Sequence, residues 1–230
     1  MSRLARAGAV LTAVVIAGAG AVTQAGGAPA ARSAAGADPA TGTRGSLAAA
    51  RCNGERWNVR NLLDRAAADV SLRPRASTVP ALLALRPPRR VTASTPRLRQ
   101  VEYRTYRLRV PLVAGRRLPN RDIVLVLGVP PATIHVVFPD THACENIVEG
   151  DQGQEIHVAS DEVENLCGVM PIGRWQRLRG RADVTGVGFF AVPHPQALAG
   201  AAPSGLELHP ALGFASSNCR GVAGGFPAAG

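Results

Sequence analysis

Residues 122–138 read DIVLVLGVPPATIHVVF and decide the fold class of this chain. The run up to Val129 is almost entirely apolar, the double proline Pro130-Pro131 forces a turn, and residues 133–138 are again mainly apolar. Two short apolar runs separated by a proline turn are typical of a buried β-hairpin. We therefore expect a mainly β protein built around this hairpin.

Further strands are expected on both sides of the hairpin, at residues 102–112, 175–181, 184–192 and 206–214. The first alternates, with Tyr106 and Leu108 on one face and Arg107 and Arg109 on the other, which predicts a half-exposed strand. Pro210 interrupts the last strand and favours an edge or a strand end. Five or six strands without regular strand–helix alternation predict a small antiparallel barrel or sandwich, with the oligonucleotide/oligosaccharide-binding (OB) type among the candidates.

One or two short helices complete the expected fold, and three segments are candidates. Residues 62–70 are rich in alanine, and Thr78 can cap a helical turn that begins with proline. Ser160 has the character of an N-cap for a helix up to Leu166, because acids follow it in the first turn.

The N-terminus has the composition of a secretory signal peptide. Arg3 and Arg6 precede an apolar run over residues 7–22, and small residues follow, with cleavage expected after Ala25 or, by slight preference, after Ala30. An uncleaved anchor is the alternative, but the run is shorter and less apolar than the ~20 residues of a membrane span. We expect a signal peptide at 1–30, a flexible linker at 31–50, one disulfide-bonded domain at 51–220 and a flexible tail at 221–230, with no transmembrane span in the mature chain.

Four cysteines in an exported chain predict two disulfides. Three pairings are open from the sequence. We favour Cys144 with Cys167, which closes the middle segment, and Cys52 with Cys219, which ties the start of the domain to its end. A four-thiolate zinc site is disfavoured because no two cysteines have the close spacing of a zinc knuckle.

The charge of the chain is strongly segregated. All 26 basic residues are arginine and the formal net charge is +10. Residues 31–121 hold 19 arginines against 5 acids, residues 122–173 hold 9 acids and no arginine, and residues 174–230 hold 5 arginines against 2 acids. Such segregation can hold two parts of one domain together or attract a polyanion to one face. We favour the first, because no aromatic residues interleave the densest basic run; a polyanion site would use Arg97, Arg99, Arg104, Arg107, Arg109, Arg116, Arg117 and Arg121.

The candidate functional site lies at residues 206–210, LELHP. Alternation in a strand would put Glu207 and His209 on one face, with the leucines in the core. With His194 and Asp122 they could bind a divalent metal, the only cofactor that the pattern admits, and an open position would let a bound water ionise. Without metal, Glu207 could orient a histidine as a general base. We favour a third, structural interpretation. In it Glu207 binds a backbone donor or an arginine, and His209 caps the end of the strand before Pro210.

The other histidines give weaker signals. His135 alternates with apolar neighbours and predicts a surface or hydrogen-bonded histidine. His142 lies in an expected turn and His157 in the acidic segment. A calcium role for that segment, through Glu149, Asp151 and Glu155, is disfavoured because the ligand pattern of a calcium loop is missing. The sequence has no nucleophile elbow and no phosphate-binding glycine loop.

Several motifs resemble a family of uncharacterised secreted bacterial proteins. They are Glu55-Arg56-Trp57 with Val59-Arg60, the stretch GVGFF at 186–190, His194-Pro195-Gln196, Ala202-Pro203-Ser204-Gly205 and LELHP at 206–210. The resemblance spans about residues 55–214 and implies a secreted β-rich domain without naming a reaction. The chain departs from the family pattern at Val124, Val137 and Ser204, where histidine, glutamate and asparagine are expected, so the resemblance implies an incomplete set of polar groups.

We therefore predict a secreted, extracellular or cell-envelope binding or accessory module without catalytic turnover. The alternative is a metal-dependent hydrolase that acts on an extracellular polymer or ester through His194, Glu207 and His209. A third interpretation is a binder of an acidic polymer or envelope component through the arginines of residues 97–121.

Overall fold

The computed structural model describes residues 52–87, 89–193 and 198–223, which all belong to the compact unit that begins at Asp38. The expected signal peptide, the expected linker, His194 and most of the expected tail lie outside the described residues.

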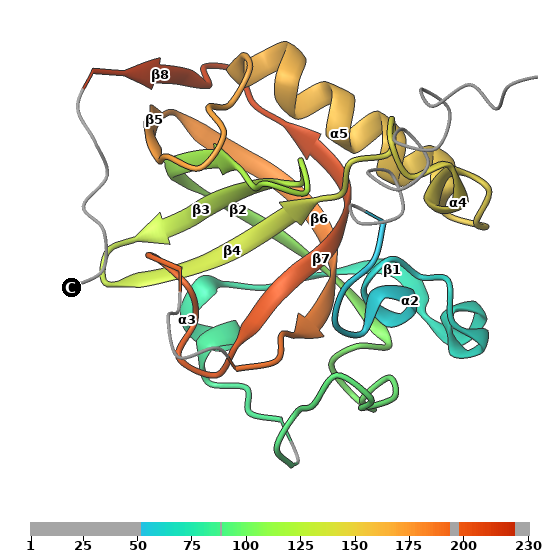
Figure 1. Cartoon of the computed structure of the whole chain (residues 1–230). Helices are drawn as coiled ribbons and strands as arrows, with labels where there is room; N and C mark the ends of the chain where they lie inside the picture. Colours follow the sequence, from blue (N-terminus) through green and yellow to red (C-terminus); the bar gives the residue numbers. More distant parts are fainter. Residues whose placement is uncertain (1–51, 88, 194–197, 224–230) are drawn as a thin grey trace, which may run out of the picture. The chain divides into compact units, whose positions relative to one another are not determined.

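Five strands close a mixed barrel (Figure 1). In order around the barrel they are β2 (Arg104–Arg117), β3 (Ile123–Val129), β4 (Ala132–Phe138), β7 (Leu206–Ala215) and β6 (Arg181–Phe190), which pairs with β2 again. The predicted barrel is confirmed, although the expectation of a wholly antiparallel barrel is wrong, because β4 and β7 pair in parallel. This strand order, with α5 (Gly153–Cys167) between the third and fourth barrel strands in the sequence, corresponds to the OB type.

Three shorter strands extend the sheet. β1 (Ser71–Ala76) pairs in parallel with the start of β2. β5 (Gln176–Arg179) pairs with Ala114 and Gly115, near the end of β2. β8 (Arg220–Val222) pairs with β5. The expected boundary of the tail at residue 221 is therefore wrong, because Gly221 and Val222 belong to a strand.

The predicted alternation of apolar and polar residues fills the barrel. In β2, Leu108 is fully buried while Arg107 and Arg109 are exposed. The predicted hairpin forms as β3 and β4, with Ile123 opposite Phe138. The inward side chains make one continuous core, whose fully buried members include Leu108, Leu125, Leu127, Ile134, Val136, Leu206 and Leu208.

Helix prediction succeeds where the signal is local. Thr78 caps α3 (Val79–Leu83) by accepting a hydrogen bond from the backbone nitrogen of Ala81 at 3.3 Å. The expected helix over 62–70 is wrong: α2 (Trp57–Arg60) comes before it, and only a 3₁₀ turn, η1 (Arg65–Asp69), lies within it.

Ser160 does not begin a helix. α5 starts at Gly153, directly after α4 (Glu145–Val148), and Gly153 allows this tight junction because a Cβ there would lie 2.1 Å from the carbonyl oxygen of Val148. Ser160 instead donates a hydrogen bond to the carbonyl oxygen of Pro139 at 2.7 Å. The helix packs on β7 through a buried stripe of Ile156, Ala159, Val163 and Cys167.

Pro210 does not mark an edge strand. β7 pairs with β4 on one side and β6 on the other, so it lies inside the sheet. Gly186 pairs with Ala211 and Gly188 with Leu208, which leaves two residues of β7 opposite one residue of β6. A bulge of this kind tolerates proline because the regular ladder is already interrupted there.

Both predicted disulfide pairings are wrong. Cys52 forms a disulfide with Cys144, and Cys167 forms one with Cys219, with Cα separations of 5.4 and 4.9 Å. The pairing of Cys144 with Cys167 is prevented by α5: Cys144 belongs to one hydrophobic cluster with Ile156 near the start of this helix, whereas Cys167 ends it, about 16 Å further along at 1.5 Å per residue.

Candidate functional site

Glu207 and His209, the main candidates from the sequence, lie side by side on the outer face of β7. Because Leu206 and Leu208 point into the barrel core, the alternate residues face outward. His209 Nδ1 lies 3.0 Å from Glu207 Oε1. The imidazole is only 2 % exposed, and its Nε2 has no hydrogen-bond partner in the described structure. The imidazole is therefore buried against a carboxylate whose side chain is 17 % exposed.

Aromatic and basic side chains surround this pair. The ring of Phe189 lies 5.7 Å from that of His209, and the Arg56 guanidinium lies 4.7 Å over the same phenyl ring. Burial raises the pKa of Glu207, but the hydrogen bond and electrostatic interaction with His209, together with the electrostatic interactions of His135 and Arg60, outweigh burial and hold the pKa below its usual value. Glu207 is therefore ionised at neutral pH.

Asp122 holds a turn together and is not a member of the Glu207–His209 pair. Its Oδ1 accepts a hydrogen bond from the backbone nitrogen of Asp140 at 2.9 Å, and its Oδ2 accepts one from the Asn120 amide at 2.7 Å. Arg60 Nη2 lies 3.7 Å from Oδ2. Among the described residues Asp122 shares no ligand shell with Glu207 and His209. Of the four predicted metal ligands, the structure thus brings two into contact, while His194 lies outside the described residues.

Two valines separate Asp122 from the polar residues of β7. Val124 and Val137 face each other across the β3–β4 ladder, and both are buried. These are the positions where the sequence departs from the family pattern. They offer no metal ligand, so the outer face of the hairpin is apolar between Asp122 and the histidines.

His135 fastens a loop to the outer face of β3 and β4. Its Nε2 lies 2.9 Å from the carbonyl oxygen of Ala199, and Thr133 donates a hydrogen bond to the carbonyl oxygen of Gly200 at 3.0 Å. Gly200 has a φ of +80° and packs so closely on Val126 that a Cβ would lie 2.5 Å from Cγ1. Burial lowers the pKa of His135 despite the opposing effect of its backbone partner. OB barrels bind ligands on this face, which here is covered by the chain itself.

Most arginines of the predicted polyanion strip have partners inside the domain. Arg116 lies over the ring of Trp175, with the guanidinium carbon 4.8 Å from its centre. Acids hold five others: Arg97 with Asp64, Arg107 and Arg109 with Asp183, Arg117 with Glu164, and Arg121 with Asp140. Arg99 and Arg104 are exposed and form no ion pair with any described residue. Six of the eight arginines of the strip therefore have partners inside the domain, but only Arg117 and Arg121 pair with acids of the acidic middle segment.

A second polar cluster was not predicted from the sequence. His142, His157 and Asp161 converge beside α5, with one ligand atom of each within 4.8 Å of the others. The spacing of His157 and Asp161, four residues apart, places them on one face of a helix. That signal was hidden because the helix was expected to begin at Ser160. The acids of the disfavoured calcium site, Glu149, Asp151 and Glu155, form no such group in the described structure.

No family model, curated protein or solved structure matches the chain. The resemblance to secreted bacterial proteins stays a prediction. None of the helices in the described residues is both long enough and apolar enough to span a membrane.

Proposed function

We propose that this protein is a secreted binding module that holds an acidic polymer outside the cytoplasm without chemical turnover. Two disulfides support an oxidising compartment, in line with the signal peptide expected at the N-terminus. The barrel type is one that proteins use for binding oligonucleotides and oligosaccharides, but the analogy extends to the fold alone, because the usual binding face is covered by residues 199–200. The burial of His209 disfavours the alternative, a hydrolase centred on this residue.

The observation that carries the proposal is a group of exposed arginines beside the pairing of β1 with β2. We call it the β1–β2 arginine patch, and it consists of Arg73, Arg75, Arg99 and Arg104. All four are exposed, and none forms an ion pair with an acid in the described part of the chain. Arg73 and Arg75 both lie on β1, whose register against β2 shifts between Ser71 and Arg75. Unpaired guanidinium groups retain their full capacity to bind phosphate or carboxylate.

The patch borders a shallow hollow that can receive one unit of a polymer. Arg99 and Arg104 line the hollow with Gln100, Tyr103 and Asp69. The amide and the phenol add neutral hydrogen-bonding groups to the two cations. A single acid, Asp69, leaves the surroundings positive. The hollow therefore suits an anionic group attached to a polar chain.

Salt dependence of binding tests this proposal. The purified protein is titrated with long-chain polyphosphate at several salt concentrations, and uncharged dextran serves as the neutral polymer. Binding to polyphosphate should weaken steeply with salt, because each neutralised phosphate of a flexible strand contributes about −0.7 to the slope of log K against log salt. Replacing the four patch arginines with glutamine should make the slope shallower by about 3.

A control variant with the same loss of charge separates a defined patch from general attraction. It carries glutamine at Arg107, Arg109, Arg177 and Arg179, which are exposed on β2 and β5. The slope of this control should stay close to that of the unmodified protein. Equal slopes for the two variants, or no binding of polyphosphate at all, would refute the proposal.

A further inference from the structure

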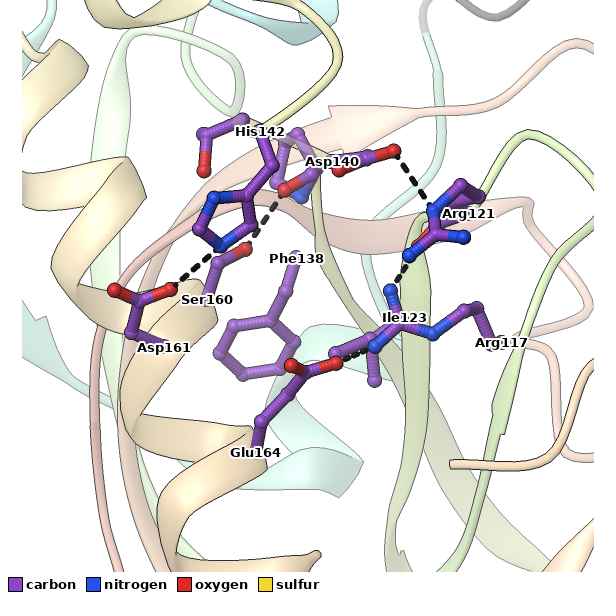
Figure 2. A pocket seen from close by; sticks show the side chains of 11 residues that line it. Arg117, Arg121, Ile123, Phe138, Asp140, His142, Ser160, Asp161 and Glu164 are labelled. Atoms are coloured by element: carbon purple, nitrogen blue, oxygen red, sulfur yellow. Dashed lines mark hydrogen bonds and ion pairs between the residues drawn. The ribbon is translucent and has the colours of Figure 1, made fainter. Parts of the chain in front are cut away.

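A cluster of two histidines and one aspartate lies at the junction between the end of β4 and α5. Figure 2 shows two of its members, His142 and Asp161. His142 comes from the loop after β4, and His157 and Asp161 come from successive turns of the helix. His142 Nε2 lies 3.0 Å from Asp161 Oδ1, and His157 Nε2 lies 3.6 Å from Asp161 Oδ2. The two imidazole rings meet edge to face, with centroids 5.2 Å apart. One carboxylate therefore bridges two imidazole nitrogens from separate elements.

Thr141 sets the orientation of one ring. Its Oγ1 lies 2.9 Å from His157 Nδ1. When Nδ1–H donates to this hydroxyl, Nε2 carries the lone pair and turns it toward Asp161. Histidines that bind metal almost always have such a partner on the other nitrogen, because it fixes both the tautomer and the ring.

The loop that carries His142 is held in place from both sides. The Cys52–Cys144 disulfide anchors it two residues after His142. On the other side Ser160, inside α5, donates a hydrogen bond to the carbonyl oxygen of Pro139. These links fix the loop against the helix before any ligand arrives, so a ligand need not order it.

The neighbouring acids are already engaged, which leaves Asp161 as the carboxylate for a ligand. In the hollow beside the cluster, Asp140 pairs with Arg121 and Glu164 with Arg117 (Figure 2). Asp161 has no arginine partner among the described residues and contacts only the two histidines. Its side chain is 42 % exposed, so solvent reaches the cluster.

We propose that His142, His157 and Asp161 bind a divalent transition metal ion, foremost Zn²⁺, with solvent in the remaining position. Two imidazoles and one carboxylate suit zinc, whereas calcium and magnesium prefer oxygen ligands alone. Three protein ligands with an open position complete the four-coordinate geometry of zinc. This site is independent of the β1–β2 arginine patch and of Glu207 and His209.

Direct metal titration tests the site. The purified protein, stripped with chelator, is titrated with Zn²⁺ by calorimetry and with Co²⁺ by visible absorption, which reports the coordination geometry. One equivalent of metal ion should bind, and the Co²⁺ spectrum should be that of a four-coordinate ion. His157→Ala and His142→Ala should each weaken binding by about 100-fold or more, and Thr141→Val by about 10-fold, because it removes only the orienting partner.

Two matched variants complete the experiment. Glu155→Gln removes an exposed acid from the same helix outside the cluster and should bind the ion as the unmodified protein does. His209→Asn tests the alternative site on β7 and should also leave the affinity unchanged. Zn²⁺ should raise the thermal midpoint of the unmodified protein but not of the His142→Ala/His157→Ala variant. The proposal fails if no stoichiometric ion binds, or if the ion is lost in the His209 variant and kept in the double variant.

Discussion

Arg56 and Glu102 form a bidentate ion pair that is completely buried. The two guanidinium nitrogens lie 2.7 and 2.6 Å from the two carboxylate oxygens, and neither side chain is exposed. Glu102 also accepts hydrogen bonds from the backbone nitrogens of Leu98 and Phe190. Arg56 in turn donates to the carbonyl oxygens of Thr95 and Phe190. The arginine of the N-terminal ERW motif therefore joins the segment before α2 to the end of β6.

Removal of one member of this pair should destabilise the protein strongly. Glu102→Gln leaves the buried guanidinium without its counter-charge, and such changes cost about 3–5 kcal/mol of unfolding free energy. Denaturant unfolding measures the loss. The exposed pair of Arg107 with Asp183 is the control, because solvent screens it and Arg107→Gln should leave the free energy of unfolding almost unchanged. Similar losses for the two variants would contradict the structural role of the buried pair.

The low pKa of Glu207 makes a prediction about acid stability. When folding lowers the pKa of a carboxyl group, that group stabilises the folded protein at pH values above its usual pKa, which is 4.5 for glutamate. This contribution is lost as the pH falls through the folded pKa. Glu207→Gln should therefore lower the free energy of unfolding at neutral pH. The difference between variant and unmodified protein should shrink as the pH falls below 4.5, because the folded-state carboxylate then becomes protonated. Chemical unfolding between pH 7 and 3 gives both curves, and parallel curves would show that Glu207 keeps its usual pKa.

The strands and the caps made by neighbouring residues could be predicted, because their signals lie within a few residues. Alternation around Leu108 and the cap at Thr78 are examples. The start of α5 could not be predicted from Ser160, since the partner of this side chain is the distant carbonyl oxygen of Pro139. The predicted disulfide partner of Cys144 was wrong for a related reason. The partner depends on the length of α5, which begins at Gly153 and so before Ser160, the residue that looked like its N-cap.

The same distinction applies to the candidate sites. Glu207 and His209 meet because residues two apart share one face of a strand. The sequence could not show that His209 would be buried there, with the ring of Phe189 beside it. His142 lies 15 residues from His157 and 19 from Asp161, and only the packing of α5 against the loop after β4 brings them together. A contact of that kind has no local sequence signal.

The observed disulfide pairing predicts a link between covalent structure and the metal cluster. Cys52→Ser/Cys144→Ser opens a loop of 92 residues, and the chain-entropy model gives a loss of about 4–5 kcal/mol. The same variant frees the loop that carries His142, so it should also weaken Zn²⁺ binding. Cys167→Ser/Cys219→Ser, which opens 52 residues, should cost a similar free energy but leave His142 anchored. Peptide mapping without reduction checks the pairing itself, and a Cys52–Cys219 peptide would overturn it.

Gly188 allows β6 to pass close to the segment before β2, and its replacement tests how tightly this contact is packed. A Cβ at Gly188 would lie 2.8 Å from Tyr106 Cε2 and 2.9 Å from both Val101 Cγ1 and the Val101 carbonyl oxygen. One of these atoms belongs to the backbone and two to buried side chains, so Gly188→Ala should cost about 1–3 kcal/mol through overpacking. Gly213→Ala in β7 is the matched control, because its added Cβ would meet only the hydroxyl of Thr185, which can rotate away. Denaturant unfolding should therefore show a clear loss for Gly188→Ala and a change within about 1 kcal/mol for Gly213→Ala, and equal midpoints would mean that the segment before β2 yields without cost.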